Sequence, residues 1–135
     1  MGHKLAIDFG TTNSVIAHWN GEDQPATIIA AQHISDTTTP GLPPVVPSLL
    51  YVQNGKSGEV IYGQQVRDQG LDAKRDNRLF RNFKRGVAAN PAPEPRMIDD
   101  SPWADKDAAR KFVTQLISSL PQNPEDIEQL VLTAP

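Results

Sequence analysis

The chain of 135 residues contains no cysteine, and this absence excludes several kinds of site. Without cysteine there is no disulfide framework, no thiolate nucleophile and no zinc–thiolate centre. Long apolar runs are also missing. None approaches the roughly 20 residues that a membrane-spanning helix needs, and the first residues do not form a signal peptide. We therefore expect a cytoplasmic protein without a membrane partner.

An excess of positive charge is also missing. The chain has 13 lysines and arginines against 16 aspartates and glutamates, which gives a net charge of −3 and an isoelectric point of about 5.5. This balance argues against a nucleic-acid partner. The three histidines, His3, His18 and His33, have no spacing typical of a metal site, and we expect them to be incidental.

What the chain does contain is a compact pattern in residues 5–19, LAIDFGTTNSVIAHW. Two apolar runs flank a small polar centre, which predicts two antiparallel strands over residues 5–9 and 15–19, joined by a tight turn. Gly10 gives the backbone freedom for that turn and lets another atom come close. Successive N–H groups in a turn form a concave nest that attracts anions, and threonine hydroxyls add further donors. The residues that would form this nest are Thr11, Thr12 and Asn13.

Asp8 is the last polar residue before the turn and can face the same mouth. A carboxylate beside an anion nest would repel the anion unless a hydrated cation lies between them. Magnesium keeps most of its waters and accepts carboxylates through them. The pattern therefore predicts a magnesium–phosphate site in which Asp8 contacts the metal through water. An ordinary hairpin turn rich in turn-forming residues would show the same letters without any ligand.

The segment IDFGTTNSVIA resembles the first phosphate-binding hairpin of the superfamily that contains actin, the sugar kinases and the heat-shock chaperone ATPases. It is most similar to the opening of the DnaK-type, seventy-kilodalton heat-shock chaperones. The resemblance implies an α/β fold, a mixed sheet with helices, that forms the first lobe of an actin-like, ribonuclease-H-like ATPase domain. It implies ATP or ADP and Mg²⁺ as ligands, and unfolded client polypeptides and co-chaperones as partners. The implied phosphate-binding residues are Gly10, Thr11, Thr12 and Asn13.

The middle of the chain shows the same order of elements as that family. Asn20-Gly21 and Asn54-Gly55 each indicate a hairpin. In the family, a strand begins at a Pro-Ser pair and a helix begins at a Gly-Gln pair, and the pairs here are Pro47-Ser48 and Gly63-Gln64. We expect a third strand over residues 26–31 antiparallel to the second, a loop over 32–47, and strands over 47–52 and 59–62.

Two short helices are expected within residues 64–86, with a break around residues 70–76. On a helical wheel for residues 77–85, the apolar side chains share one arc and most of the basic ones the opposite arc. Lys84 lies only about 40° from Phe80, at the margin of the apolar arc, so it is the cation placed to lean inward. In the family, the segment similar to NRLFRNFKRG carries the lysine that reaches the nucleotide phosphates. The resemblance therefore makes Lys84 the catalytic residue.

Residues 86–103 are rich in proline and predict a loop. Ser101 is the expected N-cap of a helix over residues 104–120, with Pro102 at the first helical position. Residues 128–133 then predict a buried strand, which should run parallel to its partner because it is reached through a helix. The resemblance places it next to the first strand. The family ends this strand in a proline tied to nucleotide-driven switching, and Pro135 takes that position here.

The resemblance covers almost all of this chain but roughly the first third of a complete nucleotide-binding domain. We therefore expect residues 1–135 to be an N-terminal fragment of that domain, with an inserted subdomain at about 35–103. The larger protein is expected to hydrolyse ATP. This fragment alone is expected to be inactive, to bind ATP with at best millimolar affinity, and to self-associate through an open sheet edge at residues 128–133. Two alternatives stay open: a fragment of a sugar kinase of the same superfamily, and a non-catalytic interaction module that kept the fold.

Overall fold

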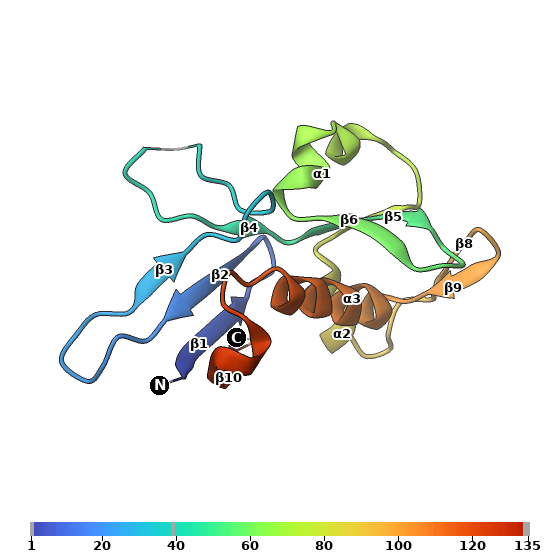
Figure 1. The fold of residues 1–135 in the computed structure, drawn as a ribbon. Coiled ribbons are helices and arrows are strands. Elements are labelled where there is room, and N and C mark those ends of the chain that lie inside the picture. Colours follow the sequence, from blue (N-terminus) through green and yellow to red (C-terminus); the bar gives the residue numbers. More distant parts are fainter. Residues whose placement is uncertain (1, 39, 134–135) are drawn as a thin grey trace.

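The computed structural model describes residues 2–38 and 40–133, which form a mixed α/β fold. Its largest sheet has the order β10-β1-β2-β3, with the short strand β4 also paired to β2 (Figure 1). Within the described residues, no helix is long and apolar enough to cross a membrane. The strands of this sheet are β1 (His3–Phe9), β2 (Asn13–His18), β3 (Thr27–Ile29), β4 (Val46–Pro47) and β10 (Ile127–Thr133).

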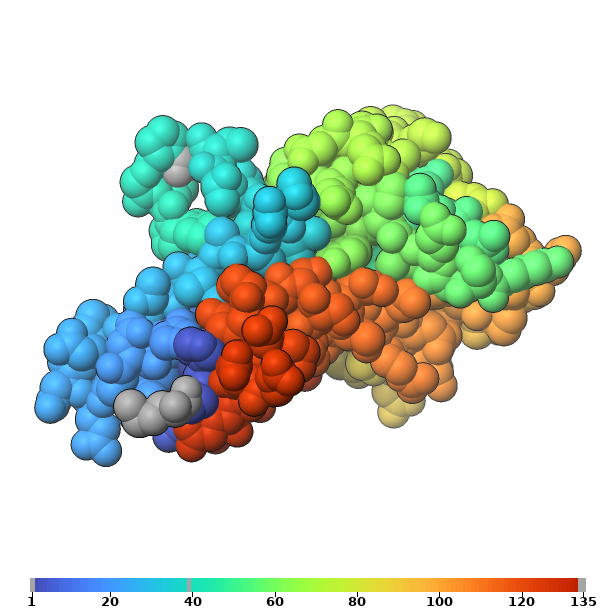
Figure 2. All heavy atoms as spheres, viewed as in Figure 1, coloured from blue at the N-terminus to red at the C-terminus, as the bar shows by residue number. Residues whose placement is uncertain are grey.

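β1 lies between β10 and β2, and its side chains alternate between the core and the opposite face of the sheet. Leu5, Ile7 and Phe9 are buried, whereas Asp8 is exposed on the other face. The expected antiparallel pairing of β1 with β2, and of β2 with β3, is confirmed. The expected parallel pairing of β10 with β1 is also confirmed, with Asp8 opposite Thr133. The expected burial of this strand is wrong, because five of its seven residues are exposed and none is fully buried. Figure 2 shows the β2–β3 hairpin, in blue, projecting from one end of the molecule.

A second sheet, with the order β6-β5-β7, lies on the other side of the molecule from β3 (Figure 1). Residues of both sheets join one hydrophobic cluster, to which β5 contributes Leu50 and Val52. The elements of this half are β5 (Leu49–Asn54), β6 (Glu59–Tyr62), α1 (Gln64–Asp68), the 3-10 helix η1 (Leu71–Ala73), β7 (Leu79–Arg81), α2 (Phe83–Ala88), β8 (Arg96–Ile98) and β9 (Ser101–Trp103).

Helix α3 (Asp105–Ser118) connects the two halves through a cluster of aromatic rings. Phe112 is fully buried; its ring stacks on that of Phe9, with centroids 5.7 Å apart, and meets the ring of Phe83 edge-on at 5.7 Å. Such pairs add stability beyond their buried area. This cluster fixes β1 and α2 against α3, and the 3-10 helix η2 (Pro124–Asp126) then leads into β10.

The expected helix over residues 77–85 is wrong. Leu79–Arg81 forms strand β7, which pairs with β5, and the helix begins only at Phe83. Asn82 separates the two elements with a left-handed backbone (φ 55°). Apolar residues at this spacing fit either element, and pairing with β5 decided the outcome, because it buries Leu79 and Phe80 on a sheet. The wheel that placed Lys84 relative to Phe80 therefore does not apply.

The expected long helix is present, but its expected N-cap at Ser101, with Pro102 at the first helical position, is wrong. Ser101 and Pro102 belong to strand β9, which pairs with β8, so the expected loop over 86–103 contains a hairpin. Helix α3 begins at Asp105, and the N–H of Ala104 donates to the Asp107 carboxylate at 2.8 Å. That bond satisfies a donor at the helix start that has no partner inside the helix. The expected role of Pro135 lies outside the described residues.

Candidate functional site at the β1–β2 turn

Gly10 opens the turn between β1 and β2, and the turn leaves no room for a side chain there. A Cβ atom built on Gly10 would lie 2.2 Å from the carbonyl oxygen of Asn13. The backbone of Gly10 does not need a positive φ, so close approach of the chain to itself, and not conformational freedom, makes glycine necessary. A larger residue at this position would therefore displace the hairpin as well as any ligand.

Ser48, which follows β4, fixes the turn from inside the protein. Its hydroxyl donates to the carbonyl oxygen of Gly10 at 2.8 Å, and its N–H donates to that of Thr12 at 2.9 Å. The same hydroxyl lies 3.0 Å from the hydroxyl of Ser14, and both serines are buried. Two carbonyl groups of the turn are thus held against the interior.

Lys84 fixes a third carbonyl group. It lies in the first turn of α2, and its Nζ atom donates to the carbonyl oxygen of Phe9 at 2.6 Å. The same ammonium lies 5.7 Å from the centre of the Phe9 ring. The structure therefore brings Lys84 to the base of the turn, although the two are 75 positions apart in sequence. The Lys84 side chain is half-buried and keeps two further N–H donors.

The bound carbonyls set the direction of the free donors. In a trans peptide, the C=O and the following N–H point in opposite directions. Because the carbonyl of Gly10 points at Ser48, the N–H of Thr11 points away from the interior. Within the described residues, the N–H groups of Thr11 and Thr12 find no protein acceptor. Thr12 and Asn13 are exposed, so the turn presents donors to solvent beside a fixed cation.

Asp8 lies next to this turn, and within the described residues no hydrogen bond joins its carboxylate to the turn. Its carboxylate accepts a hydrogen bond from the Thr133 hydroxyl at 3.2 Å and is exposed on the face of β1 opposite the core. Over residues 2–38 and 40–133, no group of three or more histidine, aspartate or glutamate side chains could hold a metal ion. Asp8 could therefore hold magnesium only together with ligands from elsewhere, such as water and phosphate oxygens.

Ser14 and Ser48 are the residues that the sequence analysis missed as part of this site. For Ser48, the sequence signal is its place inside the apolar run VVPSLLYV. A serine in such a run is expected to be buried, and a buried hydroxyl needs a hydrogen-bond partner. The sequence pattern marks Ser48 only as half of the Pro-Ser pair at which a strand begins. Its role depends on an atom 38 positions away, which no local pattern contains.

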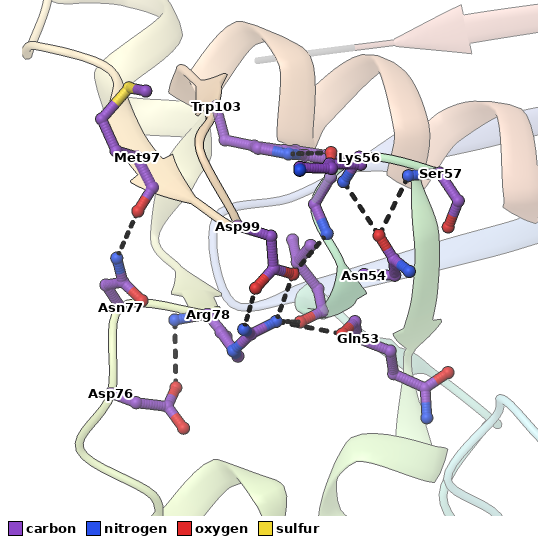
Figure 3. Close-up of polar contacts among 12 residues, drawn as sticks. Gln53, Asn54, Lys56, Ser57, Asp76, Asn77, Arg78, Met97, Asp99 and Trp103 are labelled. Carbon is purple, nitrogen blue, oxygen red and sulfur yellow. Dashed lines mark hydrogen bonds and ion pairs between the residues drawn. The ribbon is translucent and has the colours of Figure 1, made fainter.

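A second polar network lies among β5, β7 and the β8–β9 hairpin and serves the fold (Figure 3). Arg78 donates to both carboxylate oxygens of Asp99, at 3.0 and 2.5 Å, and to the carbonyl oxygen of Gln53 at 3.0 Å. The Gly55 N–H also donates to Asp99 at 2.8 Å. The hydrogen bonds from Arg78, which have the larger effect, and from the Gly55 N–H lower the pKa of the Asp99 carboxyl to about 2. This fork joins the β8–β9 hairpin to β5 and β7.

The molecule also has surface hollows that do not include the turn. One of about 450 Å³ lies between the β5–β6 turn and α3, and one of about 400 Å³ lies on the outer face of the main sheet. No protein-family model matches this chain. The chemistry that the turn itself offers is recognition of an anion by backbone donors and one ammonium group.

Proposed function

We propose that the β1–β2 turn binds the phosphates of Mg²⁺-bound ATP or ADP. The observation that carries this proposal is the ammonium of Lys84 at the Phe9 carbonyl, because it fixes a cation beside a turn whose outward N–H groups are free. We further propose, from the resemblance of residues 7–17, that the chain is the N-terminal part of the nucleotide-binding domain of a DnaK-type chaperone ATPase. A cytoplasmic location, client polypeptides and co-chaperones belong to the same proposal.

Each residue has a distinct task under this proposal. The N–H groups of Thr11 and Thr12 donate to phosphate oxygens, and the Thr11 and Thr12 hydroxyls add donors at the rim. Lys84 supplies a point charge that offsets the negative charge of the phosphates and, in a complete site, the charge that develops during hydrolysis. Asp8 orients a hydrated magnesium ion through its waters.

The turn contacts a polyphosphate from one side only. Phosphoryl transfer depends on charged groups placed around the phosphates, and good nucleotide sites enclose most of their ligand. We therefore expect these 135 residues alone to bind ATP with a dissociation constant in the millimolar range, about −4 kcal/mol, without turnover. In a longer protein with a complete cleft, Lys84→Ala should lower the hydrolysis rate by about 10²–10³-fold and nucleotide affinity much less.

The test is a titration of the ¹⁵N-labelled chain with Mg²⁺-ATP, followed through the amide signals. Saturable shifts should be largest at Thr11, Thr12 and Asn13. Pyrophosphate should reproduce them and adenosine should not, because the turn recognises phosphate. Lys84→Ala should weaken the affinity about fivefold, as expected for loss of roughly 1 kcal/mol from one partly exposed charge.

Arg85→Ala is the matched control, because Arg85 is the exposed neighbour of Lys84 on the same helix. It should leave the affinity unchanged. The proposal is wrong if the turn amides do not respond to about 10 mM ATP, a concentration above the expected dissociation constant. It is also wrong if adenosine produces the same shifts, or if Lys84→Ala and Arg85→Ala weaken binding equally.

A further inference from the structure

The open end of the β1–β2 hairpin, opposite the turn, brings two histidines together. His3 begins β1 and His18 ends β2, and the pairing of Leu5 with His18 places the two side by side. The Nδ1 atom of His3 lies 3.0 Å from the Nε2 atom of His18. The rings meet edge-on, with centroids 5.2 Å apart. Their sequence spacing gave no sign of a shared site, yet His3 and His18 share one hydrogen bond.

The surroundings of His18 fix which of its nitrogens carries the proton. Nδ1 of His18 lies 2.9 Å from Oδ1 of Asn20. The amide nitrogen of Asn20 donates to the carbonyl oxygen of Pro25 at 3.0 Å and to the Thr27 hydroxyl at 2.6 Å. The amide is therefore oriented with Oδ1 as an acceptor, so Nδ1 of His18 carries the hydrogen and Nε2 has a lone pair.

This arrangement around His18 is the one that orients imidazoles on metal ions. A ligating histidine donates its other ring N–H to a fixed oxygen, which sets the tautomer and the ring direction. Asn20 provides that oxygen and is itself fixed by two bonds. The nitrogen that remains, Nε2 of His18, is the one that points at His3. In the metal-free protein, the Nδ1–H group of His3 donates a hydrogen bond to Nε2 of His18. If this proton moves to Nε2 of His3, Nδ1 of His3 gains a free lone pair, and the protein releases no proton.

The separation of the two nitrogens matches two ligands on one cation. Two nitrogens 3.0 Å apart, each about 2.05 Å from one metal ion, make a nitrogen–metal–nitrogen angle of about 94°. The two rings must first turn so that both lone pairs face the ion. The two nitrogens can thus reach one cation, and imidazole nitrogens suit copper, nickel and zinc, among which copper binds most tightly. Square-planar geometry with nitrogen ligands is typical of Cu²⁺ and Ni²⁺.

Both histidines line a hollow of about 560 Å³ together with Gly2, Asn20 and Glu128. The hollow leaves space for waters to complete the coordination, and the Glu128 carboxylate adds negative charge. Lys4 also lines this hollow, and its ammonium lies over the Trp19 ring, 4.7 Å from the ring centre. We propose that His3 and His18 together bind a divalent cation of the copper and nickel class, with Asn20 as a positioning residue.

Titration of the chain with Ni²⁺ alone near neutral pH tests this proposal, with calorimetry for affinity and ¹⁵N signals of the imidazoles for the ligands. One ion should bind, and the Nδ1 signal of His3 and the Nε2 signal of His18 should shift. His18→Gln and His3→Gln should each abolish saturable binding, and Asn20→Ala should weaken it about tenfold. Zn²⁺ should bind more weakly than Ni²⁺, and Cu²⁺ more tightly.

His33→Asn is the matched control, because His33 is the third histidine and is exposed. Asparagine tolerates its left-handed backbone (φ 71°), so the variant should fold and bind Ni²⁺ normally. Amide spectra of the metal-free variants show whether each is folded. Binding that survives His18→Gln would assign the ion to His3 and its neighbouring backbone and overturn the proposal. Equal loss in His33→Asn, or no binding by the folded chain, would overturn it as well.

Discussion

Removal of the Ser48 hydroxyl should measure how strongly the interior of the protein holds the β1–β2 turn. Ser48 is 2% exposed and Ser14 is fully buried, so neither hydroxyl can exchange its partner for water without local opening. Ser48→Ala removes two side-chain hydrogen bonds, one to Gly10 and one to Ser14. At about 1 kcal/mol for each bond, the free energy of unfolding should fall by about 2 kcal/mol.

The hydroxyl of Ser14 provides the comparison, because it has one of these two bonds. Ser14→Ala should cost about 1 kcal/mol, since Ser48 keeps its bond to Gly10. The double variant should cost about 2 kcal/mol and not the sum of about 3, because the bond between the two serines is lost only once. This predicts a coupling energy of about 1 kcal/mol between the two positions.

Urea unfolding followed by circular dichroism measures all four proteins of this cycle, and the slope with denaturant should be the same in each. Hydrogen exchange of the N–H at position 48, which donates to the carbonyl oxygen of Thr12, adds a local readout, which Ser48→Ala should accelerate more than Ser14→Ala. Strictly additive free energies would refute the reasoning, because they would mean that the two hydroxyls do not interact. A cost below about 0.5 kcal/mol for Ser48→Ala would show that water replaces both bonds.

Two further predictions concern the rest of the fold. The pKa of Asp99 is held at about 2, below the ordinary value of about 3.9, so its stabilising contribution is present above about pH 4 and is lost as the pH falls toward 2. Acid unfolding curves of Asp99→Asn should therefore show a weaker loss of stability between about pH 4 and 2 than the unchanged protein, and equal slopes would contradict this. Phe112→Ala should cost about 3–5 kcal/mol in urea unfolding, because the fully buried ring contacts both Phe9 and Phe83. The control Ile117→Ala, at a side chain that is 39% exposed, should cost less than about 1 kcal/mol, and similar costs would be inconsistent with this core.

The parts of the fold that the sequence predicted depend on local patterns. The β1–β2 hairpin follows from alternation on both sides of the polar segment GTTNS, and a hairpin joins strands without long-range information. The parallel position of β10 was predicted because a strand reached through a helix runs parallel to its partner. Both patterns constrain the backbone strongly.

The parts that could not be predicted depend on partners far away in sequence. Leu79 and Phe80 carry no local sign that β5 will pair with them, so an amphipathic helix was an equally consistent interpretation. Ser101 and Pro102 form a good helix start in isolation, yet pairing with β8 places them in a strand. The contacts of Ser48 and of the His3–His18 pair could not be predicted for the same reason, because the fold and not the spacing along the chain brings these residues together.

The two proposed sites lie at opposite ends of one strand pair, and this arrangement makes them independent. From His3 to Phe9, β1 spans six residue steps of roughly 3.3 Å, so the histidine pair and the turn are about 20 Å apart. The buried side chains of Leu5, Ile7 and Phe9 lie between the two ends and hold the strand in the core. A cation at His3 and His18 therefore acts on the turn only through a rigid strand, and through no shared side chain. Failure of one proposal leaves the argument for the other intact, because the turn depends on Ser48 and Lys84 and the histidine pair depends on Asn20.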